Sequence, residues 1–299
     1  MTLILSGTTG AGLLRLDPES LLRNLNTHAC FVSHLLTEHP LFQMPRLLEL
    51  AKWLPAKHVR INSGDVPVGA APDEIPGTGQ TVEESFGTIE TSTTRIMLKG
   101  IEHHPEYRAL LNACLGEVES LGHASMKDIH SRVGYVFISA PNMTTPYHMD
   151  PEINFLLQIR GRKTFFVVPQ ADRDVLSEED IEAFYTGHHY KLPFRPVAKD
   201  RAIPFAMGPG EGVHIPVNSP HWVSTENEVA VSFALTVESA ATKKRGTIYG
   251  VNHYLRRLGV KPAPLGRSPA RDLLKYGSYV LWTGLKRCLP GKKSAPSDH

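Results

Sequence analysis

The stretch Thr145-Pro-Tyr-His-Met-Asp-Pro-Glu-Ile-Asn154 contains a histidine and an aspartate separated by one residue. On an extended strand, residues i and i+2 point to the same face, so the side chains of His148 and Asp150 can converge on one ion. One imidazole, one carboxylate and a second imidazole from a distant strand form the ligand set that holds Fe(II) and leaves other positions open. The sequence therefore predicts a metal site, with a third ligand elsewhere in the chain.

The third ligand must come from a segment that folds back onto this strand, and His221 is our candidate. It follows the proline-bounded turn Pro216-Val-Asn-Ser-Pro, which places it at the start of a strand. His214 is the alternative, but it lies in the middle of an apolar strand. A histidine there is ordinarily packed in the wall and hydrogen-bonded to a neighbour. We therefore expect His148, Asp150 and His221 to bind the metal.

Short strands separated by turn residues dominate the chain after Val133. Gly161 predicts a tight hairpin, and Ser177 with Asp180 has the spacing of a capping box for a short inserted helix. Many short strands with Gly and Pro punctuation are typical of a double-sheet jelly roll. The predicted strands are Tyr135–Ser139, Ile153–Ile159, Lys163–Val168, Gly212–Pro216 and Val229–Val237.

The region before these strands has mostly helical periodicity. Apolar residues recur at helical spacing over Asp17–Leu54 and on one face of Pro105–Leu121, while β-branched residues predict a strand over Thr91–Leu98. The pair His103-His104 resembles a ligand set, but adjacent side chains diverge. We expect two exposed histidines at the start of a helix.

These patterns predict a mainly β protein with flanking helices. We expect a helical N-terminal region at 1–132 that packs on the core, and a jelly-roll core (a cupin-like double-stranded β-helix) at 133–240. A basic helical C-terminal extension follows at 241–299. Within it, Asp272–Cys288 predicts an amphipathic basic helix, and the tail from Gly291 is expected to be disordered. The helix could dock on its own domain, mediate a homodimer or contact a membrane surface.

The bulk composition is that of a globular protein. The chain has 299 residues, of which 41% are hydrophobic, and 32 Lys and Arg against 30 Asp and Glu give a formal net charge of +2. This balance gives no reason to expect nucleic-acid binding. Three widely spaced cysteines predict neither a disulfide framework nor a zinc cluster. Without a secretion signal or an apolar run of about 18 residues, we expect a cytoplasmic protein.

Lys163 opens a strand of aromatic and β-branched residues. A lysine pointing into the barrel is costly to bury without an anionic partner. If Fe(II) binds 2-oxoglutarate through its 1-carboxylate and 2-oxo group, the far carboxylate lies within reach of this lysine and of the Thr145 hydroxyl. The alternative is an outward, solvated lysine in a hairpin beside Arg160 and Arg162.

Together these residues resemble the JmjC-type and cupin-like Fe(II) and 2-oxoglutarate-dependent oxygenases, most closely the branch that includes the asparaginyl hydroxylase of hypoxia-inducible factor. In that branch a threonine lies three residues before the first ligand histidine, and an asparagine and a lysine lie four and thirteen residues after the aspartate. Thr145, Asn154 and Lys163 have these spacings. The resemblance covers roughly 133–237. It departs at Ser219-Pro220, where the family has an aromatic pair, and at His214, where it has a tyrosine.

The resemblance implies a role for each matching residue. The iron ligands would be His148, Asp150 and His221. The residues around 2-oxoglutarate would be Lys163 and Thr145 as binding groups, Asn154 as a lining residue, and Tyr135 as the tyrosine that often helps to hold the far carboxylate. The implied reaction is hydroxylation of a substrate, with release of succinate and CO2 from 2-oxoglutarate.

The substrate is a weaker expectation. The relatives act on proteins, and residues 62–80, which are rich in Gly, Pro and Asp, predict a long loop that could border an extended groove, so a protein or peptide side chain is our first choice. A small metabolite is the alternative within the same mechanism. A cupin-like metal-binding regulatory or scaffold module without turnover, with the basic tail as its docking element, is the alternative from another class.

Overall fold

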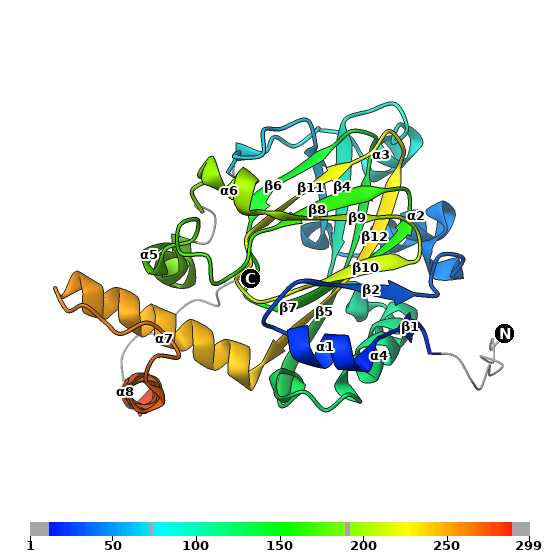
Figure 1. Cartoon of the computed structure of the whole chain (residues 1–299). Helices are drawn as coiled ribbons and strands as arrows, with labels where there is room; N and C mark the ends of the chain where they lie inside the picture. Colours follow the sequence, from blue (N-terminus) through cyan, green and yellow to red (C-terminus); the bar gives the residue numbers. More distant parts are fainter. Residues whose placement is uncertain (1–11, 72–73, 189–191, 289–299) are drawn as a thin grey trace.

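Two antiparallel β-sheets form the centre of the protein in this computed structural model, which describes residues 12–71, 74–188 and 192–288 (Figure 1). The eight-stranded sheet has the order β1 (Leu14–Arg15), β2 (Cys30–His34), β10 (Glu211–Ile215), β7 (Ile153–Arg160), β12 (Ala230–Ser239), β5 (Ile129–Ser139), β4 (Thr94–Lys99) and β3 (Val59–Ser63). The four-stranded sheet has the order β6 (Thr144–His148), β11 (His221–Thr225), β8 (Lys163–Val167) and β9 (Ile203–Met207).

The strands from β5 to β12 build the predicted jelly roll. Most consecutive strands alternate between the sheets, so that β5, β7, β10 and β12 face β6, β8, β9 and β11 across a barrel interior. An apolar cluster that includes Leu156, Phe165 and Val213 fills part of this interior. Gly161 turns the chain between β7 and β8 with φ +68°, and a Cβ there would collide with the carbonyl oxygen of Val229. The fold class predicted from the sequence is therefore confirmed.

Helices cover the outer surfaces of the barrel (Figure 1). They are α1 (Pro18–Asn24), α2 (Met44–Trp53), α3 (Val82–Gly87), α4 (Pro105–Glu119), α5 (Glu178–Ala183), α6 (Val197–Arg201), α7 (Ala240–Arg257) and α8 (Pro269–Cys288). The buried face of α4, including Leu111 and Leu115, belongs to the large apolar core behind the eight-stranded sheet. The capping box predicted at Ser177 is present at the start of α5.

The stretch Asp17–Leu54 differs from its prediction, because it is not helical throughout. Residues Cys30–His34 form strand β2, which pairs with β10 through Val213 opposite Phe31. Pairing to an open sheet edge decides the conformation of this segment over its local helical periodicity. The N-terminal region therefore supplies β1 to β4 to both edges of the sheet as well as helices.

The C-terminal helices α7 and α8 lie to one side of the barrel (Figure 1). Several apolar side chains of α8 are exposed, among them Leu273, Leu274 and Leu281. No helix in the described part of the chain is long and apolar enough to cross a membrane. A docking or dimerisation role for α8 stays a prediction, and the tail from Gly291 lies outside the described residues.

Candidate metal centre

Three side chains meet at one end of the barrel, which we call the metal end. His148 ends β6, Asp150 follows it, and His221 begins β11, where it lies opposite His148 in the sheet register. The possible ligand atoms of the three residues lie within 4.8 Å of one another. This spacing lets each atom reach one shared ion at about 2.0–2.2 Å. In the described residues, no other group of three or more His, Cys, Asp or Glu side chains meets this criterion.

Backbone carbonyl groups orient both imidazoles. Nδ1 of His148 donates to the carbonyl oxygen of Pro146 (2.7 Å), and Nδ1 of His221 donates to that of Ser219 (2.9 Å). Each bond fixes the tautomer, because it places the proton on Nδ1 and leaves the Nε2 lone pair to face the centre. Burial and the neighbouring His221 hold the pKa of His148 well below its ordinary value, which favours the neutral, liganding form.

The carboxylate is held in a similar way. Nδ2 of Asn154, on β7, donates to Oδ2 of Asp150 at 3.0 Å, and the backbone N–H of Asn218 donates to the Asp150 carbonyl at 2.9 Å. Oδ2 of Asp150 lies 3.8 Å from Nε2 of His221, too far for a hydrogen bond but suitable for two ligands of one ion. The donor set of two imidazoles and one carboxylate fits a non-haem Fe(II) ion.

A second group of polar side chains lies farther inside the barrel, at what we call the cation end. Lys163 is only 5% exposed, and its Nζ contacts Oγ of Ser139 at 3.4 Å. Thr145 lies on β6, about 10 Å along the strand from His148. The structure thus gives the inward lysine that the sequence predicted, and places the hydroxyl of Thr145 between the metal end and the cation end.

Sequence reasoning missed Arg95, which reaches the same place from β4. Its Nη1 donates to Oγ1 of Thr145 at 2.9 Å, and its Cα lies opposite Ser139 in the β4–β5 register. The one available signal was the alternation of Arg95 and Met97 with buried Ile96 and Leu98, which places the arginine on the inner face of the strand.

Tyr135 does not lie where the resemblance placed it. Its ring stacks on Phe137 inside the barrel, four residues along β5 from Ser139. Burial raises its pKa, and the charges of Glu152, Asp150 and Glu102 raise it further. The structure therefore does not bring Tyr135 into contact with Lys163 or Thr145.

The other candidate histidines have structural roles. His214 is fully buried on the outer face of β10, where Nδ1 donates to the carbonyl oxygen of Asn154 (3.1 Å) and Nε2 accepts from the backbone N–H of Asn26 (2.9 Å). Both ring nitrogens are therefore occupied. Nδ1 of His103 is likewise bonded to the carbonyl of Gly100, and His104 occupies the N-cap position of α4 without a capping hydrogen bond from its side chain.

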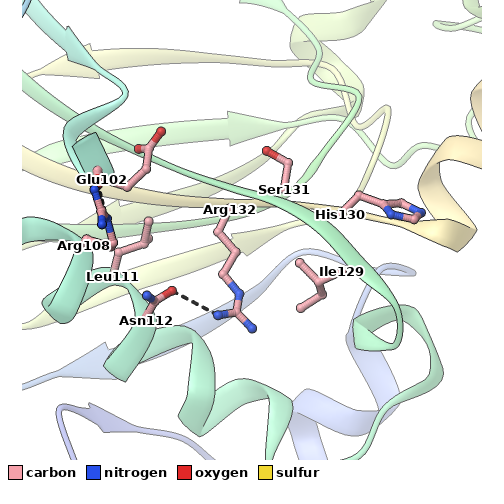
Figure 2. Close-up of a pocket in the computed structure, with 8 residues that line it drawn as sticks. All are labelled: Glu102, Arg108, Leu111, Asn112, Ile129, His130, Ser131 and Arg132. Carbon is pink, nitrogen blue, oxygen red and sulfur yellow. Dashed lines mark hydrogen bonds between the residues drawn. The ribbon is translucent and has the colours of Figure 1, made fainter. Parts of the chain in front are cut away.

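A surface groove lies outside the barrel, between α4 and the start of β5 (Figure 2). It encloses about 450 Å³ and its lining includes no metal-end residue. Its charged groups are already paired: Arg132 donates to Asn112 and Glu119, and Arg108 donates to two backbone carbonyls. Nε of Arg132 has no hydrogen-bond partner, but no metal-ligating group of side chains is found in the groove among the described residues.

No protein-family model matches the sequence, and no curated protein matches it. Among solved structures, the chain is similar to the ribosomal oxygenase YcfD from Escherichia coli in complex with cobalt and 2-oxoglutarate. The identity is 16%, the TM-score is 0.51, and the match covers 90% of this chain and 67% of that one. Another structure of E. coli ycfD gives 17% identity, a TM-score of 0.49, and coverage of 90% and 68%. The match to the DMSP lyase DddQ from Ruegeria pomeroyi has 18% identity and a TM-score of 0.24, and it covers 37% of this chain and 40% of that one.

At this level of identity, a match shows the fold and leaves the activity open. None of these structures is an asparaginyl hydroxylase, so they give no support to placing the chain in that branch. The chain has the jelly-roll fold of the ribosomal oxygenase YcfD, with two histidines and an aspartate gathered at one end of the barrel.

Proposed function

We propose that this protein is an Fe(II) and 2-oxoglutarate-dependent oxygenase that hydroxylates a protein or peptide side chain. The observation that carries the proposal is the meeting of His148, Asp150 and His221, each already oriented by a hydrogen bond, at the end of a barrel that also holds a buried lysine. A facial set of three ligands leaves positions for a chelating co-substrate and for dioxygen. Bound iron would couple decarboxylation of 2-oxoglutarate to hydroxylation of the substrate.

The protein's own residues would bind, orient and shield the reactants. Lys163 and Thr145 would hold the far carboxylate of 2-oxoglutarate by charge-assisted hydrogen bonds. Asn154 would fix the Asp150 carboxylate that faces the metal. The apolar side chains Leu156, Phe165 and Val223 line the interior and would keep water from the reacting atoms.

A polypeptide substrate is supported by analogy with YcfD, which is a ribosomal oxygenase and binds cobalt and 2-oxoglutarate. Cobalt(II) prefers ligands similar to those of Fe(II), so the donor set described above suits either ion. Ribosomal proteins are therefore the first substrate pool to test.

The test is release of succinate by the full chain with Fe(II), 2-oxoglutarate and either a ribosomal-protein pool or a metabolite pool. Stimulation by the protein pool, with a matching mass increase of one oxygen on a polypeptide, is the expected result. Stimulation by metabolites alone would move the substrate to a small molecule. Iron and 2-oxoglutarate binding without turnover in any pool would favour a non-catalytic binding module.

A further inference from the structure

Two polar contacts cross the barrel from one sheet to the other at the cation end. Arg95 of β4 reaches Thr145 of β6 (2.9 Å), and Lys163 of β8 reaches Ser139 of β5 (3.4 Å). Arg95 and Ser139 are register partners on neighbouring strands, while Thr145 and Lys163 lie on the two strands that flank β11. The guanidinium and the ammonium group therefore approach the same region from opposite walls.

Neither cation has an anionic partner. Among the described residues, no carboxylate oxygen lies within 4.0 Å of the charged nitrogens of Arg95, Lys163 or the neighbouring Arg60, whereas most other arginines of the chain have such a partner. The side chains that they contact are neutral hydroxyl groups. Buried cations without counter-charges are costly, and they persist where a ligand supplies the missing charge.

Burial and a neighbouring positive charge act on both groups. Burial, and then the charge of Arg95, lower the pKa of Lys163 to about 7. Burial, and then the charge of Arg60, lower the pKa of Arg95. A small pocket of about 70 Å³ opens beside Arg95, lined also by Arg60 and Asn62, so the guanidinium has room to adjust to a ligand.

We propose that Arg95 is a second cationic anchor for the far carboxylate of the co-substrate. Lys163 and Arg95 then bind this carboxylate from opposite sheets, and the site selects a dianionic 2-oxo acid over a monoanionic one. This rests on the proposed function and adds to it a specificity residue from β4, outside the strands of the jelly roll. A guanidinium can donate two parallel hydrogen bonds to a carboxylate, which a single lysine cannot.

A purely structural reading would have Arg95 join the two sheets through Thr145. That role needs one hydrogen bond and no charge, and a half-buried guanidinium without a counter-charge is a costly means of making it. The two readings differ in what happens when the charge is removed. The structural reading predicts a less stable protein, whereas the anchor predicts weaker binding of dianions and no loss of stability in the empty protein.

The experiment compares Arg95→Gln with Arg60→Gln, a matched change at the exposed side of the same pocket. Binding of 2-oxoglutarate and of 2-oxovalerate, which lacks the far carboxylate, is measured on the Fe(II)-loaded full chain without oxygen, through the visible absorption of the chelate. We expect Arg95→Gln to weaken the binding of 2-oxoglutarate about tenfold to a hundredfold and to change the binding of 2-oxovalerate by no more than about twofold. Arg60→Gln should change neither by more than about twofold, and Arg95→Lys should recover part of the loss.

Equal weakening of both acids, or no weakening of 2-oxoglutarate, would overturn the proposal. Thermal unfolding of the empty variants shows whether they are folded. To separate this inference from the proposed function, glutarate binding to the full chain is measured by calorimetry, because glutarate has the carboxylates but cannot be turned over. Loss of glutarate binding in Arg95→Gln would support the anchor even if no oxygenase activity is found. Unchanged glutarate binding would reject the anchor and leave the oxygenase proposal standing.

Discussion

At the metal end, the Nδ1 atoms of His148 and His221 donate to carbonyl oxygens and Asp150 accepts from an amide, so every ligand has a partner that holds it in place. At the cation end, Lys163 and Arg95 share one region of the barrel, where each contacts a neutral hydroxyl group. The hydrogen bonds at the metal end are therefore complete before any ion or co-substrate binds. The cation end is left without a counter-charge until an anion arrives.

This difference predicts opposite consequences of mutation at the two ends. Removing a group at the metal end should lower metal affinity, with no gain in stability to offset it. Removing a cation at the cation end should lower the affinity for the co-substrate and raise the stability of the empty protein, because an unpaired charge is removed from the interior. Measuring both quantities for each variant tests whether the ends differ in this way.

Loss of a metal ligand should have the largest effect. We expect Asp150→Ala or His148→Ala to reduce Fe(II)-dependent succinate formation by at least about 100-fold. Loss of a residue that only hydrogen-bonds a metal ligand lowers activity by up to about 100-fold, and loss of the ligand itself should cost more. His28→Ala, an exposed histidine, is the control and should behave as wild type. Undiminished turnover in either ligand variant would reject the metal site.

Lys163→Met should lower the affinity for the co-substrate and stabilise the empty protein. We expect the KM for 2-oxoglutarate to rise about tenfold to a hundredfold with iron binding unchanged. The pKa of Lys163 is lowered to about 7 from an ordinary value near 10.4, so the lysine costs stability progressively as pH falls from about 10.4 to 7.

The empty Lys163→Met protein should therefore gain about 1–4 kcal/mol in its free energy of unfolding at pH 7, and less near pH 10. Urea unfolding at the two pH values measures this gain. A Lys163→Met variant that is less stable than wild type and binds 2-oxoglutarate normally would show that the two ends do not differ as proposed.

The metal end was largely predictable from sequence because its signals are local. His148 and Asp150 share one strand face by simple alternation, and His221 follows a turn marked by two prolines. The strands of the jelly roll were predictable for the same reason, since alternation and turn residues are read within a few positions.

The cation end was only half predictable because it depends on pairing between distant strands. Lys163 has a recognisable spacing from Asp150, but Arg95 reaches Thr145, fifty residues away in the sequence, only because β4 pairs with β5. The same limit explains β2, whose strand conformation comes from pairing with β10. Tyr135 was chosen by residue type, and its register on β5 placed it toward the metal end.

Asn154→Leu should have a smaller effect, confined to the metal end. The substitution removes the amide that holds Oδ2 of Asp150 and keeps a similar volume, so Fe(II) affinity should fall about tenfold. Competition with a coloured chelator measures the affinity, and Asn112→Leu in the outer groove is the control. The KM for 2-oxoglutarate at saturating iron should change less than in Lys163→Met. A larger change in that KM would mean that Asn154 acts on the co-substrate directly.

His214, the histidine in the outer wall of the barrel, gives the smallest and most gradual effect, and its variant distinguishes a wall residue from a metal ligand. Burial lowers its pKa to about 3, well below the ordinary value near 6.5. Between these values the unfolded chain takes up a proton that the folded protein does not. The stability contribution of the neutral ring is therefore complete above pH 6.5 and is lost as pH falls, by up to about 1.4 kcal/mol per pH unit.

In His214→Gln this dependence should be absent, while His34 and His148, whose pKa values are also lowered, titrate in both proteins. The difference between the two slopes of unfolding free energy, measured in urea from pH 7 to 4.5, therefore isolates His214. Iron affinity at pH 7 should be unchanged, since both nitrogens of His214 are bonded within the wall. Equal slopes would mean that His214 has the same pKa in the folded and unfolded protein, and a loss of iron binding would return it to the list of ligands in place of His221.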